Sequence, residues 1–142
     1  MRIREADPED AAGLASLLAE LGYPDEAEPV RTRLRSFAQD STSFVLVAED
    51  AVRLLGAAAA SVIPLLHEDG SWCRLSALIV AEASRRASIG RALVTEVEQR
   101  ARAAECRYLE VTSGERPDRE AAHAFYEALG LEQVSRRYLK AL

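Results

Sequence analysis

The sequence predicts a mixed α/β domain built on one sheet. Segments with strand-like and helix-like patterns alternate along the chain, and two strand-like segments in the first half are joined by a tight turn. A tight turn gives antiparallel neighbours, whereas a strand, helix, strand crossover in the second half gives a parallel pair. The sheet is therefore expected to be mixed rather than fully parallel. We expect residues 1–142 to form a single domain, as suits a chain of this length.

Turn and capping signals delimit the elements of the first half. Asp7 as an N-cap and Pro8 at the first helical position start a helix, and Gly22 ends it. Two prolines mark the loop that follows this helix. The expected elements are, in order, a strand over 1–6, a helix to about residue 21, an arginine-rich helix over 30–37, and strands over 43–49 and 53–63.

The second half alternates more regularly. Apolar residues recur at helical spacing after Gly90, and Gly130 is placed to close a later helix. Residues 64–71 and 113–118 have the composition of loops. The expected elements are a strand over 72–80, a helix after residue 90, a strand over 108–112, a helix over 119–129 and a last strand over 131–139.

Composition excludes several classes of function. A net charge of -5 disfavours nucleic acid as the main partner, because binding to a phosphate backbone needs a basic face. Cys73 and Cys106 lie far apart without metal-ligand or redox spacing, so we expect no metal site and two free thiols. The first residues are charged and no run approaches about 18 apolar residues, so neither a signal peptide nor a membrane span is predicted. A cytoplasmic protein is the default expectation.

The junction within residues 78–104 carries the clearest functional signal. An apolar strand runs through a turn with three arginines, Arg85, Arg86 and Arg91, into an amphipathic helix. The first N–H groups of a helix have no intrahelical acceptor, and the helix dipole adds partial positive charge there. With arginines around it, such a helix start can hold a pyrophosphate.

Two segments, RRASIG at residues 85–90 and AAHAFYEALGLEQVS at residues 121–135, together resemble the GCN5-related N-acetyltransferases, the GNAT superfamily. The first, RRASIG, aligns with the family's phosphate loop at Arg85, Arg86, Ala87, Ser88, Ile89 and Gly90. The second, AAHAFYEALGLEQVS, matches a later family motif at Ala122, Phe125, Tyr126, Gly130 and Leu131. The pattern of the tail is most similar to the small enzymes grouped with aminoalkylphosphonate N-acetyltransferases.

Ser88 departs from the family's phosphate loop, which has a glycine at this position. Either the turn here avoids a positive φ, or Ser88 adopts one at a cost of about 1 kcal/mol or more. Weaker cofactor binding is one consequence of such a cost. The second arginine, Arg86, compensates in that case through contacts with phosphate.

The resemblance implies the GNAT fold and acetyl-CoA as co-substrate. The fold is a mixed, mostly antiparallel sheet flanked by about four helices, in which the strand of the first motif splays from the strand after its helix. By this resemblance Leu78, Ile79 and Val80 pair with the pantetheine amides, and a donor among them stabilises the oxyanion of the acetyl group. Residues 85–91 bind the pyrophosphate. Arg119 either reaches a cofactor phosphate or simply starts a helix.

The catalytic candidates are Tyr126 and Glu110. Tyr126 matches the family's frequent general acid, since a phenol is protonated at neutral pH and can donate to the departing sulfur. The alternative is that Tyr126 only packs against the cofactor. Glu110, in a strand that resembles that of ribosomal-protein N-acetyltransferases, is the leading base, acting directly or through water. Its alternative is a carboxylate that is solvated or paired with an arginine such as Arg119 or Arg107.

Three further features stay open at this stage. His123, near Tyr126, either shuttles protons or contacts the cofactor, or it has only a capping or packing role on its helix. The loop residues His67, Glu68 and Asp69 either attract a cationic amine or form an ordinary solvated loop. The expected final strand, with Tyr138, offers an edge for a possible homodimer.

The sequence therefore predicts an acetyl-CoA-dependent N-acetyltransferase that acts by direct transfer on a primary amine of a small molecule or peptide. Neither cysteine lies in the matched segments, which disfavours a route through an acylated thiol. The alternative is a non-catalytic acyl-CoA-binding regulatory module, which the Ser88 departure would suit. A dinucleotide-binding oxidoreductase is disfavoured, because no GxGxxG motif follows the first strand.

Overall fold

The computed structural model describes residues 1–85, 87–113 and 119–142. The chain divides into two compact units, Met1–Glu110 and Val111–Leu142. The loop expected over 113–118 falls, after its first residue, outside the described residues, and so does Arg86. In the part of the chain that the structure describes, no helix is long and apolar enough to cross a membrane.

One five-stranded sheet forms the centre of the first unit, with the strands in the order β1-β2-β3-β4-β5. The pairs β1–β2, β2–β3 and β3–β4 are antiparallel, and β4 and β5 are parallel. This arrangement confirms the predicted mixed sheet. The strands are β1 (Arg2–Glu5), β2 (Ser43–Glu49), β3 (Leu54–Pro64), β4 (Ser71–Val80) and β5 (Cys106–Val111).

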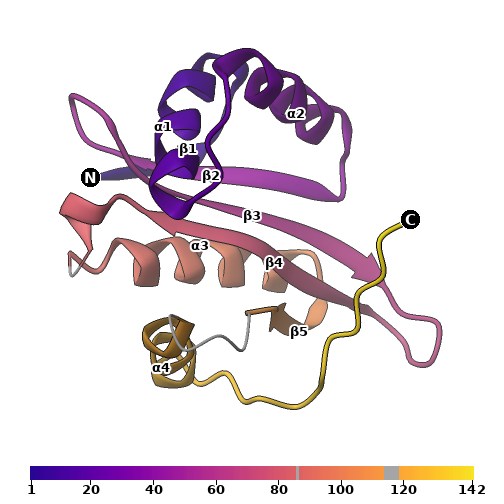
Figure 1. Ribbon diagram of the computed structural model, residues 1–142. Helices are drawn as coiled ribbons and strands as arrows, with labels where there is room; N and C mark the ends of the chain where they lie inside the picture. Colours follow the sequence, from indigo (N-terminus) through magenta and orange to yellow (C-terminus); the bar gives the residue numbers. More distant parts are fainter. Residues whose placement is uncertain (86, 114–118) are drawn as a thin grey trace. The chain divides into compact units, whose positions relative to one another are not determined.

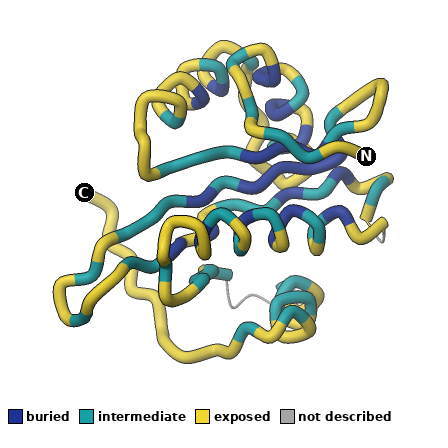
Figure 2. Tube along the Cα trace, turned by 180° about the vertical axis from the view of Figure 1, so that it is seen from behind, coloured by how far each residue is buried: buried dark blue, intermediate teal, exposed yellow. Residues whose placement is uncertain are grey.

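Helices cover both faces of this sheet. α1 (Ala11–Leu21) and α2 (Ala27–Gln39) lie on one face, and α3 (Ile89–Ala103) lies on the other (Figure 1). Figure 2 shows that the buried residues gather in the strands and on the helix sides turned toward them. The core on the α1 and α2 side includes Val47, Ala57 and Ile79, whereas α3 buries Leu93 and Val97.

The helix boundaries follow the capping signals, with one difference. Asp7 accepts from the Glu9 N–H at 2.7 Å, but its first turn, η1 (Pro8–Asp10), is a 3-10 turn that precedes α1. Gly22 ends α1 in the left-handed region at φ 98°. α2 begins at Ala27 rather than at residue 30, since Pro29 lies in its first turn, where a proline removes no intrahelical hydrogen bond.

A bulge divides β4 into two halves. Ala59 faces Ala77 in the ladder but Ala60 faces Leu75, so Ser76 is an extra residue on β4. Side chains alternate between the faces of a strand, and one extra residue reverses that alternation. Ile79 therefore points toward α1 and α2, while Cys73 and Leu75 are buried on the opposite face. Trp72 and Arg74, which alternate with Cys73 and Leu75 before the bulge, therefore lie on the same face of the sheet as α1 and α2.

The second unit contains α4 (Glu120–Ala128), after which Gly130 takes a φ of 88°. The strand expected over 131–139 is wrong, because this segment has no strand or helix. Val134, Tyr138 and Leu139 are all exposed. Tyr138 and Leu139 are adjacent in the chain, so they fall on opposite faces of any strand and leave it without one apolar side.

Gly56 lets α3 lie close to the sheet. A Cβ at this position would sit 2.7 Å from the Ile79 carbonyl oxygen and 3.2 Å from side-chain atoms of Ile89 and Leu93. The first of these contacts is with the backbone of β4, which cannot rotate away. The start of α3 can therefore pack closely against the end of β4 because Gly56 on β3 has no side chain.

We predict that Gly56→Ala lowers the free energy of unfolding by about 1–3 kcal/mol, because the added methyl overpacks a site bounded by backbone. Gly22→Ala is the matched control. Its added Cβ would meet nothing within 4 Å, so only its φ of 98° opposes alanine, at about 1 kcal/mol. Urea denaturation measures both. A Gly56→Ala variant no less stable than Gly22→Ala would contradict this packing.

Candidate active site

The turn from β4 into α3 is anchored at two backbone positions. Directly after β4, the Ala81 N–H donates to the Leu55 carbonyl at 2.8 Å, which extends the contact with β3. The Glu82 N–H then donates to a carboxylate oxygen of Glu20 on α1 at 2.7 Å. A 3-10 turn, η2 (Glu82–Ser84), follows, and α3 begins five residues later at Ile89. These contacts fix where the chain leaves the sheet.

Ser88 occupies the left-handed region, with φ 60° and ψ 15°, at the N-cap of α3. Of the two outcomes that the sequence left open, this is the strained one. The Ser88 carbonyl accepts from the Ala92 N–H at 3.0 Å, but its side chain makes no capping hydrogen bond. The first N–H groups of α3 thus have no side-chain acceptor at the N-cap, and such uncapped N–H groups can bind an anionic ligand.

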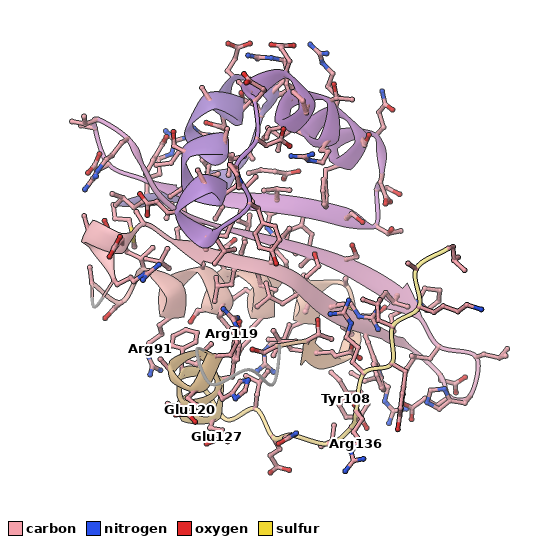
Figure 3. The ribbon with its side chains drawn as sticks, in the orientation of Figure 1. Arg91, Tyr108, Arg119, Glu120, Glu127 and Arg136 are labelled. Atoms are coloured by element: carbon pink, nitrogen blue, oxygen red, sulfur yellow. The ribbon has the colours of Figure 1, made fainter. Side chains whose placement is uncertain are left out.

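The surface before α3 is open and carries arginine. Arg85 and Arg91 are exposed, and Figure 3 shows Arg91 on the first turn of α3. An open hollow of about 600 Å³ lies at the turn, lined by Glu82, Ala83, Ser84, Arg85 and Ala87. The Glu82 carboxylate reduces the positive charge there. The donor set of helix N–H groups and arginine fits a diphosphate.

The last three residues of β4 differ in burial and in the face of the sheet that they occupy. Ile79 is buried in the core beneath α1 and α2, while Leu78 and Val80 are half-buried and take the opposite face. On one edge β4 is paired with β3 as far as Val80. On the other edge β4 lies beside β5. Trp72 contacts Tyr108 and Arg74 contacts Glu110, so each β4 residue is matched with the β5 residue 36 positions later in the sequence.

This offset matters for the other edge of β4. β5 ends as a strand at Val111, which corresponds to Leu75 on β4. Among the described residues, β5 therefore offers no strand partner to Leu78, Ile79 and Val80. Backbone groups on that edge of β4 are available for another partner, such as an extended ligand.

Glu110 is paired with an arginine, but not with either of the two considered from the sequence. Its Oε1 accepts from Nε of Arg74 on β4 at 2.7 Å, and its side chain is 24% exposed. Arg107 instead approaches Glu68 at 3.6 Å and donates to the Asp69 carbonyl. Arg74 was not singled out in the sequence, because an arginine in an alternating strand reads as an ordinary solvent-facing residue.

Tyr126 lies on α4 in the second unit and is half-buried. Burial raises the pKa of its phenol above the usual 10.0, and the nearby charge of Arg119 opposes this rise. The ring packs edge-on against Phe125, with centroids 5.5 Å apart. Arg119 precedes the first turn of α4 (Figure 3), and its guanidinium donates to the hydroxyl of Ser113 at 3.4 Å. The raised pKa keeps the phenol protonated at neutral pH.

The loop between β3 and β4 is less acidic in effect than its sequence indicates. Glu68 lies 3.6 Å from the guanidinium of Arg107, so part of the negative charge is balanced. His67 packs edge-on against Trp72. The loop therefore does not act as an isolated negative patch.

The thiols are poorly suited to nucleophilic chemistry. Cys73 is fully buried, and burial raises the pKa of its thiol to about 11. Burial also raises the pKa of Cys106. Little thiolate is present at neutral pH, and the thiolate is the reactive form. Within the described ranges, no group of three or more histidine, cysteine or acidic side chains is arranged to hold a metal ion.

Comparisons with known proteins agree with this arrangement. The model of the acetyltransferase (GNAT) family matches residues 11–131. Among solved structures, a putative acetyltransferase from Agrobacterium tumefaciens str. C58 is 22% identical with a TM-score of 0.88, and 100% of each chain is covered. No curated protein matches the chain.

Two other solved structures share the fold. A GNAT family acetyltransferase from Staphylococcus aureus has a TM-score of 0.84 at 18% identity, covering 99% of this chain and 98% of that one. An aminoglycoside N-acetyltransferase, AAC(6')-Iy, was solved in complex with CoA and has a TM-score of 0.84 at 17% identity, covering 99% and 93%. The fold and family predicted from the sequence are confirmed. The protein therefore belongs to the acetyltransferase (GNAT) family, whose enzymes use acetyl-CoA.

Proposed function

We propose that this acetyltransferase transfers the acetyl group directly from acetyl-CoA to a primary amine of a small molecule or peptide. The observation that carries the proposal is the start of α3, where Ser88 in the left-handed region leaves the first helical N–H groups uncapped beside exposed arginines. The family model spans residues 11–131 and so crosses from the first unit into the second. We accordingly treat residues 1–142 as one functional domain.

The cofactor site in this proposal has two parts. The diphosphate lies on the N–H groups of residues 88–91, with the guanidinium groups of Arg85 and Arg91 as charge partners. Arg86 and Arg119 complete the proposed set. The pantetheine amides pair with the edge of β4 at Leu78, Ile79 and Val80, the edge to which β5 offers no strand partner within the described residues. A backbone donor on the same edge stabilises negative charge on the acetyl oxygen.

Acetyl-CoA supplies an activated acetyl carbon bound to sulfur. A neutral amine nitrogen attacks this carbon, so that an N–C bond forms and the C–S bond breaks. The nitrogen releases one proton, which Glu110 accepts directly or through water. The departing sulfur takes one proton from the hydroxyl of Tyr126. Because burial raises the pKa of this phenol, it carries the proton needed at neutral pH.

The direct route is supported by the state of the thiols. A route through an acylated enzyme would need a reactive nucleophile, and burial raises the pKa of both Cys73 and Cys106. The rival function, an acyl-CoA-binding module without turnover, rested on Ser88 replacing a glycine. Ser88 adopts a positive φ as glycine would, so this replacement does not abolish the loop conformation.

The strain at Ser88 gives a paired test of the phosphate site. Glu105, at the far end of α3, also has a positive φ, 59° against 60° for Ser88. Replacing either residue with valine should lower the free energy of unfolding by about 1–3 kcal/mol, since a β-branched residue resists the left-handed region. Only Ser88→Val should weaken CoA binding, as measured by calorimetry. Equal CoA affinity in the two variants would remove Ser88 from the phosphate site.

The role of Tyr126 gives a test of turnover. The wild type should release free thiol from acetyl-CoA in proportion to an added primary amine. Tyr126→Phe should lower kcat by about 100-fold and leave acetyl-CoA affinity within about twofold, because the hydroxyl acts in the transfer step. Tyr138→Phe, which removes an exposed phenol, is the control.

The pH dependence of kcat provides the second half of this test. The acid form of Tyr126 is lost as the pH rises through its pKa, which burial places above 10.0. Activity should therefore persist to pH 10 before falling. A Tyr126→Phe enzyme with the kcat of the wild type would refute the acid role. Acetyl-CoA binding with no amine-dependent thiol from any acceptor would favour the non-catalytic module.

A further inference from the structure

A row of polar side chains crosses the sheet on the face that α1 and α2 cover elsewhere. Ser43 on β2 faces Ser61 on β3, and their hydroxyl oxygens are 2.8 Å apart. Ser61 in turn faces Arg74 on β4, whose Nε donates to Glu110 on β5. Arg74 lies on this face because the bulge at Ser76 reverses the alternation of β4. Its side chain is 47% exposed, so the row is open to solvent within the first unit.

An apolar row runs beside the polar one, two residues further toward the start of β4. Ile63 on β3 faces Trp72 on β4, and the ring of Trp72 meets that of Tyr108 on β5 edge-on at 5.7 Å. Tyr108 is 51% exposed. The indole Nε1 of Trp72 is buried and has no hydrogen-bond partner among the described residues. An aromatic shelf thus adjoins the ion pair.

The guanidinium of Arg74 has donors to spare. Arginine carries five N–H groups, and its Nε is the atom that binds Glu110. In the described part of the chain, neither terminal nitrogen of Arg74 has a hydrogen bond. These nitrogens form a planar fork that matches a carboxylate or a similar oxyanion.

The charges of the pair select against a simple cationic amine. An ammonium group that approaches Glu110 also approaches the positive charge of Arg74, and the two effects oppose each other. A ligand that carries an anionic group next to its amine can place the anion beside Arg74 and the amine beside Glu110, so both contacts are attractive. Electrostatic matching of this kind gives specificity more than raw affinity.

We propose that the acceptor is a primary amine that bears an acidic group. Its anion lies on the free nitrogens of Arg74, its amine reaches Glu110, and its carbon chain packs on Trp72 and Tyr108. This inference rests on the proposed function, since it gives Glu110 the amine. Arg74 is then a specificity residue for the acetyl transfer.

The test compares acceptors that differ in the acidic group alone. The wild type should acetylate β-alanine with a higher kcat/KM than n-propylamine, and taurine separates a carboxylate requirement from a general anion requirement. Arg74→Gln should lower kcat/KM for β-alanine about tenfold or more, mainly through KM, because a charge-assisted hydrogen bond is lost. For n-propylamine, which has no anion for Arg74 to bind, the same variant should lose a smaller factor, set only by the lost contact with Glu110. Arg74→Lys, which keeps the charge without the fork, should fall between.

Arg107→Gln is the matched control, since it removes a neighbouring arginine of equal exposure on β5 that contacts Glu68 instead of Glu110. It should leave the ratio of the two acceptors unchanged. Thermal melting of each variant verifies folding. An Arg74→Gln enzyme that loses both acceptors equally, or a wild type that prefers n-propylamine or putrescine, overturns the inference while the transferase function stands. Absence of acetyl-CoA binding in the wild type would instead refute the proposed function itself.

Discussion

The structure depends most on the close approach of α3 to the end of β4. This approach is possible because Gly56 on β3 has no side chain, and it is secured where Ala81 and Glu82 donate to Leu55 and to Glu20. Because the chain is fixed at these points, only a short segment is left to turn from the end of β4 at Val80 to the start of α3 at Ile89. Ser88 then takes the left-handed conformation, and the N–H groups of α3 face the open turn. Packing in the core thus fixes the helix start at which we propose that the diphosphate binds.

The bulge at Ser76 is the second constraint, since it gives the two halves of β4 different tasks. After the bulge, Ile79 anchors the strand in the core, and the edge at Leu78 to Val80 extends beyond β5. Before the bulge, Arg74 is turned onto the face where it meets Glu110. One extra residue therefore connects the proposed cofactor edge with the proposed acceptor surface. Because both lie on one strand, their spacing is set by covalent geometry.

Much of this arrangement could be predicted from the sequence, and the remainder could not for physical reasons. Strong local signals, such as Asp7 and Pro8 at a helix start, predicted most helices and strands. The two motifs around Ser88 and Tyr126 predicted the family. The partner of Glu110 depends on strand register and on a bulge that leaves no local pattern. The expected strand over 131–139 is wrong, and its adjacent apolar residues Tyr138 and Leu139 would give such a strand no single buried face.

The central claim is that the start of α3 binds the diphosphate of coenzyme A. Isothermal titration of the wild-type protein with CoA and, separately, with pantetheine tests it most directly, because pantetheine keeps the arm that would pair with β4 and lacks the diphosphate. The account predicts that CoA binds at least about tenfold more tightly than pantetheine, as expected when charge-assisted hydrogen bonds to phosphate are removed. Equal affinity for the two ligands, or no heat from CoA at millimolar concentration, would contradict it.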